Sequence, residues 1–405
     1  MSHSVMALLM DTRLLLRKVK DLRSLTPRRH RVKEKWATTR AKCPASSLAL
    51  QYFDANYSAH LGDLWPSVRV ALLSERKYGA LLNNFSHEDV LADLQARGCR
   101  DFINDTDTEA QPCSEEKSET CLEEESNNVP VKKPDVDDQL LSPLKLSPNI
   151  KCVVFPRGDI TRFKPARPDM ERLLGYYLMD AASVLPCLAL DVQEGHNVLD
   201  LCAAPGGKAL TLLQTQAIRF LCVNDSTASR TTRLRKVLHS YLPKHFFTEK
   251  NLRITTFDGT KWGEIERNTF DRVLVDVPCT TDRHSLIEDD NNIFNKIRTG
   301  ERRKLPQLQL ELLLAGIQAA CPGGEIMYST CTLSPIQNLS VVEQAVHLAR
   351  ENHGISVEVV DLRALTHMFR KTFHFAPDLH LGEMVIPHLA ANFGPIYMCK
   401  LRRLT

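Results

Sequence analysis

Two cysteines, Cys279 and Cys331, each follow a short apolar segment that we interpret as a buried strand. Cys279 ends the sequence Asp276-Val-Pro-Cys279, and Cys331 ends Ser329-Thr-Cys331. A free thiol in such a place is either a small apolar residue of the interior or a nucleophile. The groups at neighbouring strand ends decide between these roles. We interpret five other cysteines as buried structural thiols, namely Cys152, Cys187, Cys222, Cys321 and Cys399.

A loop with two glycines, Asp200-Leu-Cys-Ala-Ala-Pro-Gly-Gly-Lys208, separates a predicted strand from the helix that follows it. Adjacent glycines let the backbone approach a ligand closely and present amide donors at the start of a helix. The loop is not a Walker loop, because Cys202 occupies the position of its first glycine and Ala209 follows the lysine. It also lacks the glycine spacing of a dinucleotide-binding loop. These exclusions leave a nucleoside cofactor without a pyrophosphate.

Acidic residues follow the next two predicted strands. Asp225 ends the second strand, about where a carboxylate binds ribose hydroxyls in a doubly wound fold. Asp258 and Gly259 end the third, and a carboxylate there can accept a hydrogen bond from the exocyclic amine of adenine. Each aspartate alone would be an ordinary turn residue. Together with the glycine loop, at the sheet edge where ligands bind, they lead us to infer S-adenosylmethionine as the ligand.

The two thiols and this cofactor together predict one reaction. In the usual order of such sheets the fourth and fifth strands are adjacent, about 4.8 Å apart, so both thiols would face the donor methyl group. Carbon 5 of a pyrimidine is a poor nucleophile until a thiolate has added to carbon 6, and the covalent intermediate divides one difficult step into easier ones. Asp276 is placed to hydrogen-bond nitrogen 3 of the ring. The pattern favours methylation of a pyrimidine at carbon 5.

The elements that must position these residues begin at about residue 150, where short apolar segments alternate with amphipathic helices. Such alternation is typical of a parallel sheet with helices on both faces. We therefore predict an α/β fold with a doubly wound, mostly parallel, seven-stranded Rossmann-like sheet. The predicted strands are 197–202, 219–223, 252–256, 271–276, 325–329, 355–360 and 396–401, and the predicted helices are 208–216, 233–241, 307–320 and 336–350.

Composition divides the chain into four parts. Residues 1–42 carry twelve Lys/Arg and three Asp/Glu with an amphipathic pattern, which predicts a mitochondrial transit peptide; the alternative is a basic RNA-binding arm. In residues 43–100 apolar side chains recur three or four residues apart, which predicts a small helical region. Residues 101–149 carry thirteen Asp/Glu and four Lys/Arg, which predicts a disordered acidic insert. The methyltransferase domain would then occupy residues 150–405.

The overall composition excludes several other classes of protein. The 405 residues have a formal net charge of +3 and a hydrophobic content of 43%, which is ordinary for a globular protein. Twelve cysteines occur without any C-x-x-C pair, so we expect no metal site and no disulfide framework. No apolar segment approaches the ~20 residues that a membrane-spanning helix needs. The charge of residues 151–405 is near neutral, so the sequence does not indicate a polybasic nucleic-acid-binding domain there.

The three motifs 201–208, 276–279 and 329–331 resemble those of the Nop/Sun-domain RNA cytosine-5 methyltransferases. The segments 176–183 and 399–403 also match, so the resemblance covers about residues 150–405. It implies that Cys331 is the nucleophile and that Cys279 assists release of the product. It also assigns to the cofactor and catalytic pocket the residues Gly206, Gly207, Lys208, Asp225, Arg230, Asp258, Gly259 and Asp276.

Shorter segments, among them 63–67, 280–285 and 289–294, resemble the mitochondrial ribosomal-RNA member of this family. The resemblance implies methylation of small-subunit ribosomal RNA in the mitochondrial matrix, a role in mitoribosome assembly, and a heterodimer with an mTERF-type (mitochondrial termination-factor-like) protein. A basic partner would supply the affinity for the phosphate backbone that a near-neutral catalytic half lacks. Candidate RNA contacts within the chain are Arg157, Arg162, Lys164, Arg167 and the cluster 298–304.

Three other functions compete with this interpretation. The chain could be an RNA-binding assembly scaffold whose catalysis is dispensable, although intact Cys331, Cys279 and Asp276 argue against lost chemistry. It could be a cytosine-5 methyltransferase that acts on tRNA. A cysteine hydrolase is disfavoured, because His284 is the only histidine near either thiol motif.

Overall fold

The computed structural model describes residues 43–405 except 88, 106–145 and 378. The predicted transit peptide of residues 1–42 and most of the acidic insert therefore lie outside the described residues. All elements below belong to the unit from Pro44 to Thr405. In this described part, no helix has the length and apolar character needed to cross a membrane.

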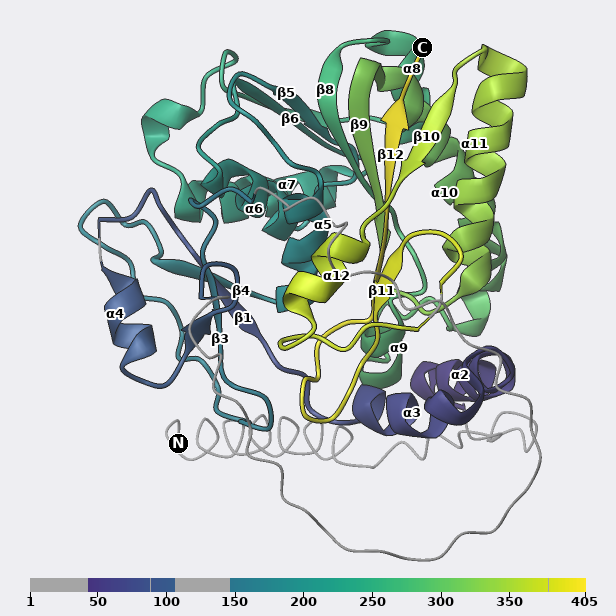
Figure 1. Ribbon diagram of the computed structural model, residues 1–405, viewed down its shortest axis with the longest axis horizontal. Helices are drawn as coiled ribbons and strands as arrows, with labels where there is room; N and C mark the ends of the chain where they lie inside the picture. The colour runs from purple at the N-terminus through teal and green to yellow at the C-terminus, as the bar shows by residue number, and fades with distance from the viewer. Residues whose placement is uncertain (1–42, 88, 106–145, 378) are drawn as a thin grey trace, which may run out of the picture. The chain divides into compact units, whose positions relative to one another are not determined.

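A mixed sheet of eight strands forms the centre of this unit (Figure 1). Its order is β10-β12-β9-β8-β5-β6-β7, and β11 pairs with β12 beside β10. The strands from β5 to β9 are parallel, whereas β12 is antiparallel to its neighbours. The bounds are β5 (Asn197–Asp200), β6 (Phe220–Asp225), β7 (Leu252–Thr256), β8 (Phe270–Asp276), β9 (Ala320–Thr330), β10 (Val357–Val360), β11 (Glu383–Val385) and β12 (Ile396–Arg403).

The α/β fold class and the mostly parallel sheet are confirmed, and each of the seven predicted strands is present. The prediction of seven strands missed an eighth, β11, because three residues are too few to show a period. The helices include α5 (Leu185–Ala189), α6 (Gly207–Gln214), α7 (Ala228–Tyr241), α8 (Trp262–Ile265), α9 (Asp282–Ile287), α10 (Thr299–Ala319), α11 (Leu339–His353) and α12 (Arg363–Phe369). Helix α10 begins well before the predicted residue 307 and contains Pro306 in its interior.

Alternating side chains of the strands enter two separate apolar layers. Val198 and Leu274 pack in the layer that contains residues of α5, α6, α7 and α12. Leu199 and Val273 point the opposite way and pack with residues of α10 and α11. This is the two-residue period of a strand that is buried on both faces. The sheet is thus fixed from both sides, and its carboxyl edge is left for the loops that carry the predicted site.

A second, antiparallel sheet of four strands has the order β2-β3-β1-β4. Its strands are β1 (Gly79–Leu82), β2 (Arg100–Asp101), β3 (Cys152–Val154) and β4 (Tyr176–Met179). The predicted N-terminal helical region is present as α2 (Ala45–Leu61), α3 (Trp65–Leu73) and α4 (Val90–Gln95), and residues 43–100 also contribute β1. Strand β1 was not predicted, because it pairs with strands that lie far along the chain and local periodicity carries no signal of such pairing.

The start of the predicted acidic insert is also ordered, which corrects its boundary. Asp101 belongs to β2, and Phe102 and Ile103 are buried in the main core. The ring of Phe102 makes edge contacts with Phe369 and Phe373 at centroid distances of 5.6 and 5.1 Å. Phe102 and Ile103 bury apolar surface, which helps to offset the entropy of ordering this segment.

Replacing Phe102 with alanine is expected to lower the free energy of unfolding by about 3 kcal/mol, because a buried aromatic ring leaves a cavity between two other rings. Urea denaturation followed by circular dichroism measures the change. The matched control is Ile160→Ala, whose side chain is 88% exposed and should change stability by less than about 0.5 kcal/mol. Equal effects of the two substitutions would contradict the corrected boundary.

Candidate active site

The sulfur atoms of Cys279 and Cys331 lie 3.3 Å apart, in hydrogen-bond contact. Strands β8 and β9 are parallel neighbours and pair up to Asp276 and Ser329, so the two thiols follow adjacent strand ends as predicted. Cys279 is buried, whereas Cys331 is partly exposed. A partly exposed thiol can reach a bound substrate, and a buried one directly beside it can act on the same atoms.

The surroundings of the pair distinguish the two thiols. The backbone N–H groups of Thr281 and Cys331 both donate to the sulfur of Cys279, each at 3.4 Å. The hydrogen bond with Cys279, together with burial, raises the pKa of Cys331 well above its usual value. This shift favours the protonated thiol, so formation of the nucleophilic thiolate of Cys331 needs a positive charge nearby. Lys208 is the cation that acts in that direction.

Lys208 and Asp276 form an ion pair next to the thiols, with Nζ and Oδ2 3.0 Å apart. The hydroxyl of Ser329 donates to the other oxygen, Oδ1, at 2.7 Å. Burial works against the charge of Lys208, but the carboxylate of Asp276 raises the pKa of this lysine above its ordinary value. The Asp276 side chain remains 30% exposed, so its carboxyl group can still form a hydrogen bond with a ligand.

The glycine loop leads from β5 into α6, and its backbone conformation and packing show why glycine occupies positions 206 and 207. Gly206 has φ +120°, and a Cβ atom there would lie 3.0 Å from the side chain of Leu234. A larger residue is therefore excluded both by the backbone angle and by packing. At Gly207 a Cβ atom would lie 3.1 Å from the ring of Tyr177. Both positions let the loop backbone run where side chains would not fit.

The predicted residues Asp225 and Arg230 meet the same loop. Arg230 forms an ion pair with Asp225 at 3.1 Å and donates to the carbonyl of Ala204 at 2.9 Å. The backbone N–H of Ala204 donates to Asp225 Oδ2 at 3.3 Å. This buried carboxylate at the end of β6 is thus held against the loop after β5, as a ribose-binding acid would need to be.

Asp258 makes local hydrogen bonds within its own turn. Its carboxylate accepts hydrogen bonds from the backbone N–H and hydroxyl of Thr260, and it caps the short turn that begins at Gly259. The link to the glycine loop runs through Asn224, whose side-chain amide donates to the carbonyls of Leu201 and Phe257. A role of Asp258 toward adenine stays a prediction.

Asp200, the first residue of the glycine loop, was not singled out from the sequence. Its carboxyl group is completely buried, and neither oxygen has a hydrogen-bond partner among the described residues. Burial, with a contribution from the charge of Asp276, raises the pKa of Asp200 to about 8. Its position at the start of the glycine loop, where strand β5 ends, was the sequence signal that could have drawn attention to it.

The site fits the cofactor inferred from the sequence. Lys208 and Arg230 are the cations that touch the loop in the described structure, and each is paired with a carboxylate. A pyrophosphate would require free cations or the missing glycines, whereas a nucleoside with a zwitterionic tail suits a loop of backbone donors and acids. The residues that would hold it are those of the glycine loop with Asp225 and Arg230.

Several of the candidate RNA contacts are engaged within the protein. Arg162 pairs with Glu75, and Arg298 pairs with Glu301, both at 2.6 Å. The guanidinium group of Arg302 lies 4.5 Å from the ring centroid of Phe294. These contacts do not prevent binding of RNA, but they reduce the free charge available for it, and contact with RNA stays a prediction.

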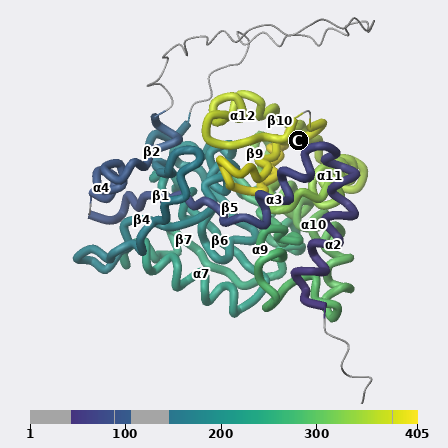
Figure 2. The backbone as a smooth tube through the Cα atoms, turned by 90° about the horizontal axis from the view of Figure 1, so that it is seen from below, coloured from purple at the N-terminus to yellow at the C-terminus, as the bar shows by residue number. Residues whose placement is uncertain are grey.

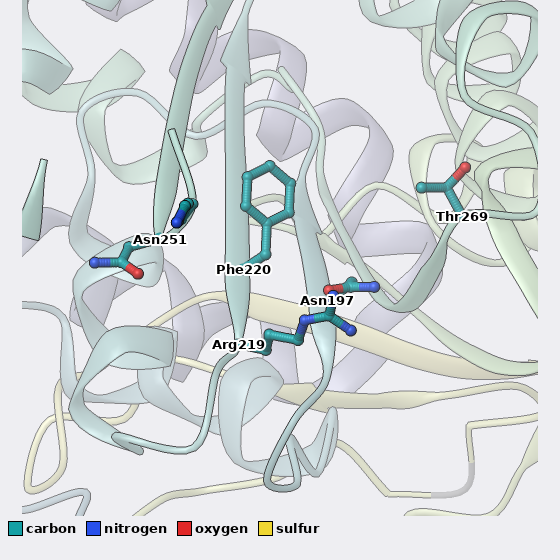
Figure 3. Close-up of a pocket in the computed structure, with 6 residues that line it drawn as sticks. Asn197, Arg219, Phe220, Asn251 and Thr269 are labelled. Atoms are coloured by element: carbon teal, nitrogen blue, oxygen red, sulfur yellow. The ribbon is translucent and has the colours of Figure 1, made fainter. Parts of the chain in front are cut away.

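A hollow of about 530 Å³ lies at the opposite edge of the central sheet (Figure 3). Its lining residues begin or immediately precede the parallel strands β5 to β8, so it opens at the amino ends of these strands. No predicted site residue lines it. The residues are Asn197, Arg219, Phe220, Lys250, Asn251 and Thr269.

Comparison with known proteins agrees with this geometry. A family model described as 16S rRNA methyltransferase RsmB/F matches residues 187–394. The 5-cytosine rRNA methyltransferase NSUN4 of Xenopus laevis is 52% identical over 400 residues, which cover 96% of this chain and 98% of that protein. The protein of the same name from Mus musculus is 53% identical over 93% of this chain and 94% of its own length. The mitochondrial tRNA (cytosine(34)-C(5))-methyltransferase of Danio rerio is 36% identical over 88% of this chain and 87% of its own length.

Solved structures share the fold. A methyltransferase homolog protein from Pyrococcus horikoshii superimposes with a TM-score of 0.56 at 20% identity, over 88% of this chain and 97% of that chain. NSun6 from Pyrococcus horikoshii with SFG gives a TM-score of 0.54 at 15% identity, over 88% and 98%. The predicted Nop/Sun resemblance and the cofactor, S-adenosylmethionine, are confirmed. The chain belongs to the 16S rRNA methyltransferase RsmB/F family and is an S-adenosylmethionine-dependent methyltransferase.

Proposed function

We propose that this enzyme methylates carbon 5 of a cytosine in mitochondrial small-subunit ribosomal RNA through a covalent adduct with Cys331. The observation that carries the proposal is the 3.3 Å contact of two thiols beside the Lys208–Asp276 pair. A methyltransferase whose substrate atom is an oxygen or an amine nitrogen needs no catalytic thiol, because that atom is itself a sufficient nucleophile for the methyl group. A thiol pair at the edge of the cofactor loop matches the demand of an unreactive ring carbon.

Each residue of the site has a separate role in the proposed reaction. Lys208 lowers the cost of forming the Cys331 thiolate, which adds to carbon 6 of the cytosine. Asp276 takes up a proton when cytosine binds and donates it to nitrogen 3 of the ring, where the added charge is taken up. When bound, S-adenosylmethionine would supply the electrophilic methyl group for carbon 5. The proton of carbon 5 then leaves to a base, the bond from carbon 6 to sulfur breaks, and Cys279 assists this release.

The choice of RNA rests on the curated relatives. The relatives that are about half identical to this chain are named as rRNA methyltransferases, whereas those named as mitochondrial tRNA methyltransferases are 36% and 33% identical. Both groups are far more similar than chance, so tRNA is the second candidate substrate. The basic, amphipathic character of residues 1–42 supports the mitochondrial matrix as the location.

A basic mTERF-type partner is part of the proposal, together with a role in mitoribosome assembly. RNA affinity depends on the number of phosphates that free cations neutralise. Arg162 and Arg298 are already paired with glutamates, so a chain of this charge needs a second source of cations. A heterodimer would provide it.

Bisulfite sequencing of mitochondrial RNA from cells that lack the protein tests the proposal. We expect one 5-methylcytosine to disappear from small-subunit ribosomal RNA and to return with the wild-type chain but not with Cys331→Ala. Disappearance from a tRNA instead would establish the second candidate. Recovery of mitoribosome assembly by Cys331→Ala without methylation would show that the assembly role is separate from catalysis.

A further inference from the structure

The loops that carry the two thiols leave the central sheet before their cysteines. The last paired residues of β8 and β9 are Asp276 and Ser329. Thr330 still pairs with Tyr397 of β12, but the pairing of β8 with β9 does not by itself set the separation of Cys279 and Cys331, whose sulfurs lie within 3.3 Å. Some other contact must join the loops, because an unsupported loop would let this distance vary by ångströms and weaken any step that needs both sulfurs.

Asp282 joins the two loops. Its carboxylate accepts a hydrogen bond from Thr280 at 2.7 Å, in the loop of Cys279, and another from the backbone N–H of Leu333 at 2.8 Å, in the loop of Cys331. Its own backbone N–H donates to the carbonyl of Cys331 at 3.3 Å. The side chain is completely buried. Asp282 thus bridges the two thiol-bearing segments, next to a direct 2.8 Å hydrogen bond between the hydroxyls of Thr280 and Thr332.

A third donor reaches Asp282 from the N-terminal region. The hydroxyl of Tyr57, on α2, donates to Asp282 Oδ2 at 2.8 Å. The ring of Tyr57 is itself fixed, since it stacks on Phe53 at 5.0 Å and makes an edge contact with Trp65. Figure 2 shows α2 close to α9, the helix that begins at Asp282. The hydrogen bond therefore ties α2 to the catalytic loops.

The surroundings of Asp282 consist of donors rather than a cation. Burial raises the pKa of Asp282, while the hydrogen bonds from Leu333, Thr280 and Tyr57 oppose that rise. The neighbouring Arg283 points elsewhere and donates to the carbonyls of Gly394 and Ala71 and to Asn392. A buried carboxylate whose donors come from three segments holds those segments rigidly, because losing any one donor leaves an unsatisfied group.

We propose that Asp282 is a positioning residue that sets the separation of the two catalytic sulfurs, and that Tyr57 makes α2 part of the catalytic unit. Asp282 touches neither sulfur and acts through the two loops. The kinetic consequence rests on the proposed function, but the geometric claim does not. It can therefore be tested without RNA or methyl donor.

The test is the rate at which a diazene oxidant, diamide, closes a Cys279–Cys331 disulfide in the full chain, followed by mass spectrometry of the linked peptides. Each thiol gives up its hydrogen, the sulfurs bond, and the diazene is reduced to a hydrazine. Asp282→Asn keeps the shape but turns an amide N–H toward donors, and we expect disulfide formation to slow at least ten-fold. Tyr57→Phe removes one donor, and we expect a slowing of about three-fold.

Asp289→Asn is the matched control. Asp289 also ties α2 to the segment after α9, through a hydrogen bond from the backbone N–H of Ser46 at 2.9 Å, but it does not contact the thiol loops. Its substitution should leave the rate of disulfide formation unchanged. If Asp282→Asn fails to fold, Tyr57→Phe carries the test alone. An unchanged rate in a folded Asp282→Asn chain, or in Tyr57→Phe when that variant stands alone, would overturn the proposal.

A second measurement connects the geometry to catalysis. In single turnovers on RNA, Asp282→Asn should reduce the rate constant of adduct formation at least ten-fold while the KM for RNA changes less than two-fold. A merely structural role would lower the fraction of active protein and leave the rate constant of the folded fraction unchanged. If disulfide formation slows but the wild-type chain methylates no RNA, the proposed function fails and the positioning role stands.

Discussion

Cys331→Ala is expected to reduce methyl transfer by about 10⁴-fold or more, because the variant lacks the sulfur that forms the bond to carbon 6 in the proposed mechanism. Cys279→Ala is expected to give a different result: the chain should stay covalently attached to its RNA. The two sulfurs are 3.3 Å apart, so the one that does not attack is placed to assist when the carbon–sulfur bond must break. Denaturing gel electrophoresis of protein with labelled RNA and methyl donor measures the adduct.

Cys321→Ala is the control for both variants. Cys321 lies on β9, the strand that leads to Cys331, but near its other end, where its thiol contacts Asp271. This substitution should leave both methylation and adduct level unchanged. An adduct that accumulates in Cys331→Ala rather than in Cys279→Ala would exchange the roles of the two thiols. Full activity of Cys331→Ala would refute covalent catalysis through this residue.

Asp276→Asn is expected to slow methyl transfer by about a hundred-fold to ten-thousand-fold, the range for a group that handles a proton or developing charge in the transition state. The amide keeps the size of the side chain and can still accept from Ser329, but it lacks the charge that holds Lys208. Lys208 would then be held less firmly and would stabilise the Cys331 thiolate less. Rapid-quench single turnovers with saturating methyl donor measure the rate.

Ser329→Ala tests how much the orientation of the Asp276 carboxylate contributes, separately from its charge. It removes the 2.7 Å hydrogen bond and leaves the ion pair with Lys208 in place, so we expect a loss of about ten-fold to a hundred-fold, the worth of one hydrogen bond to a charged group. Isothermal titration should show that Asp276→Asn weakens binding of S-adenosylmethionine far less than it slows the reaction. A large loss of affinity with a nearly normal rate would assign Asp276 to the cofactor alone.

The sequence predicted well the parts of the molecule in which local pattern and structure coincide. The inner strands of the parallel sheet are rich in apolar residues because both of their faces are buried, and each parallel strand was identified. The adjacency of Cys279 and Cys331 followed from strand order alone. Lys208, Asp276 and the two thiols were all named from the sequence, and the structure brings them together.

The features that were missed depend on contacts between distant segments. Strand β1 carries four residues and finds its partners in β3 and β4, so its existence could not be deduced from its own sequence. Asp282 stands in a segment that was noted only for its resemblance, and nothing nearby in the chain indicates that Tyr57 reaches it. A buried hydrogen bond across more than two hundred residues has no sequence period.

The placement of β12 has a consequence for refolding. Residues 396–403 lie between β9 on one side and β10 and β11 on the other. Until β12 has docked, the margin of β9, the strand that leads to Cys331, exposes unpaired N–H and C=O groups to which a strand of another chain can add. Loss of β12 would therefore leave the nucleophile next to an open, aggregation-prone sheet edge.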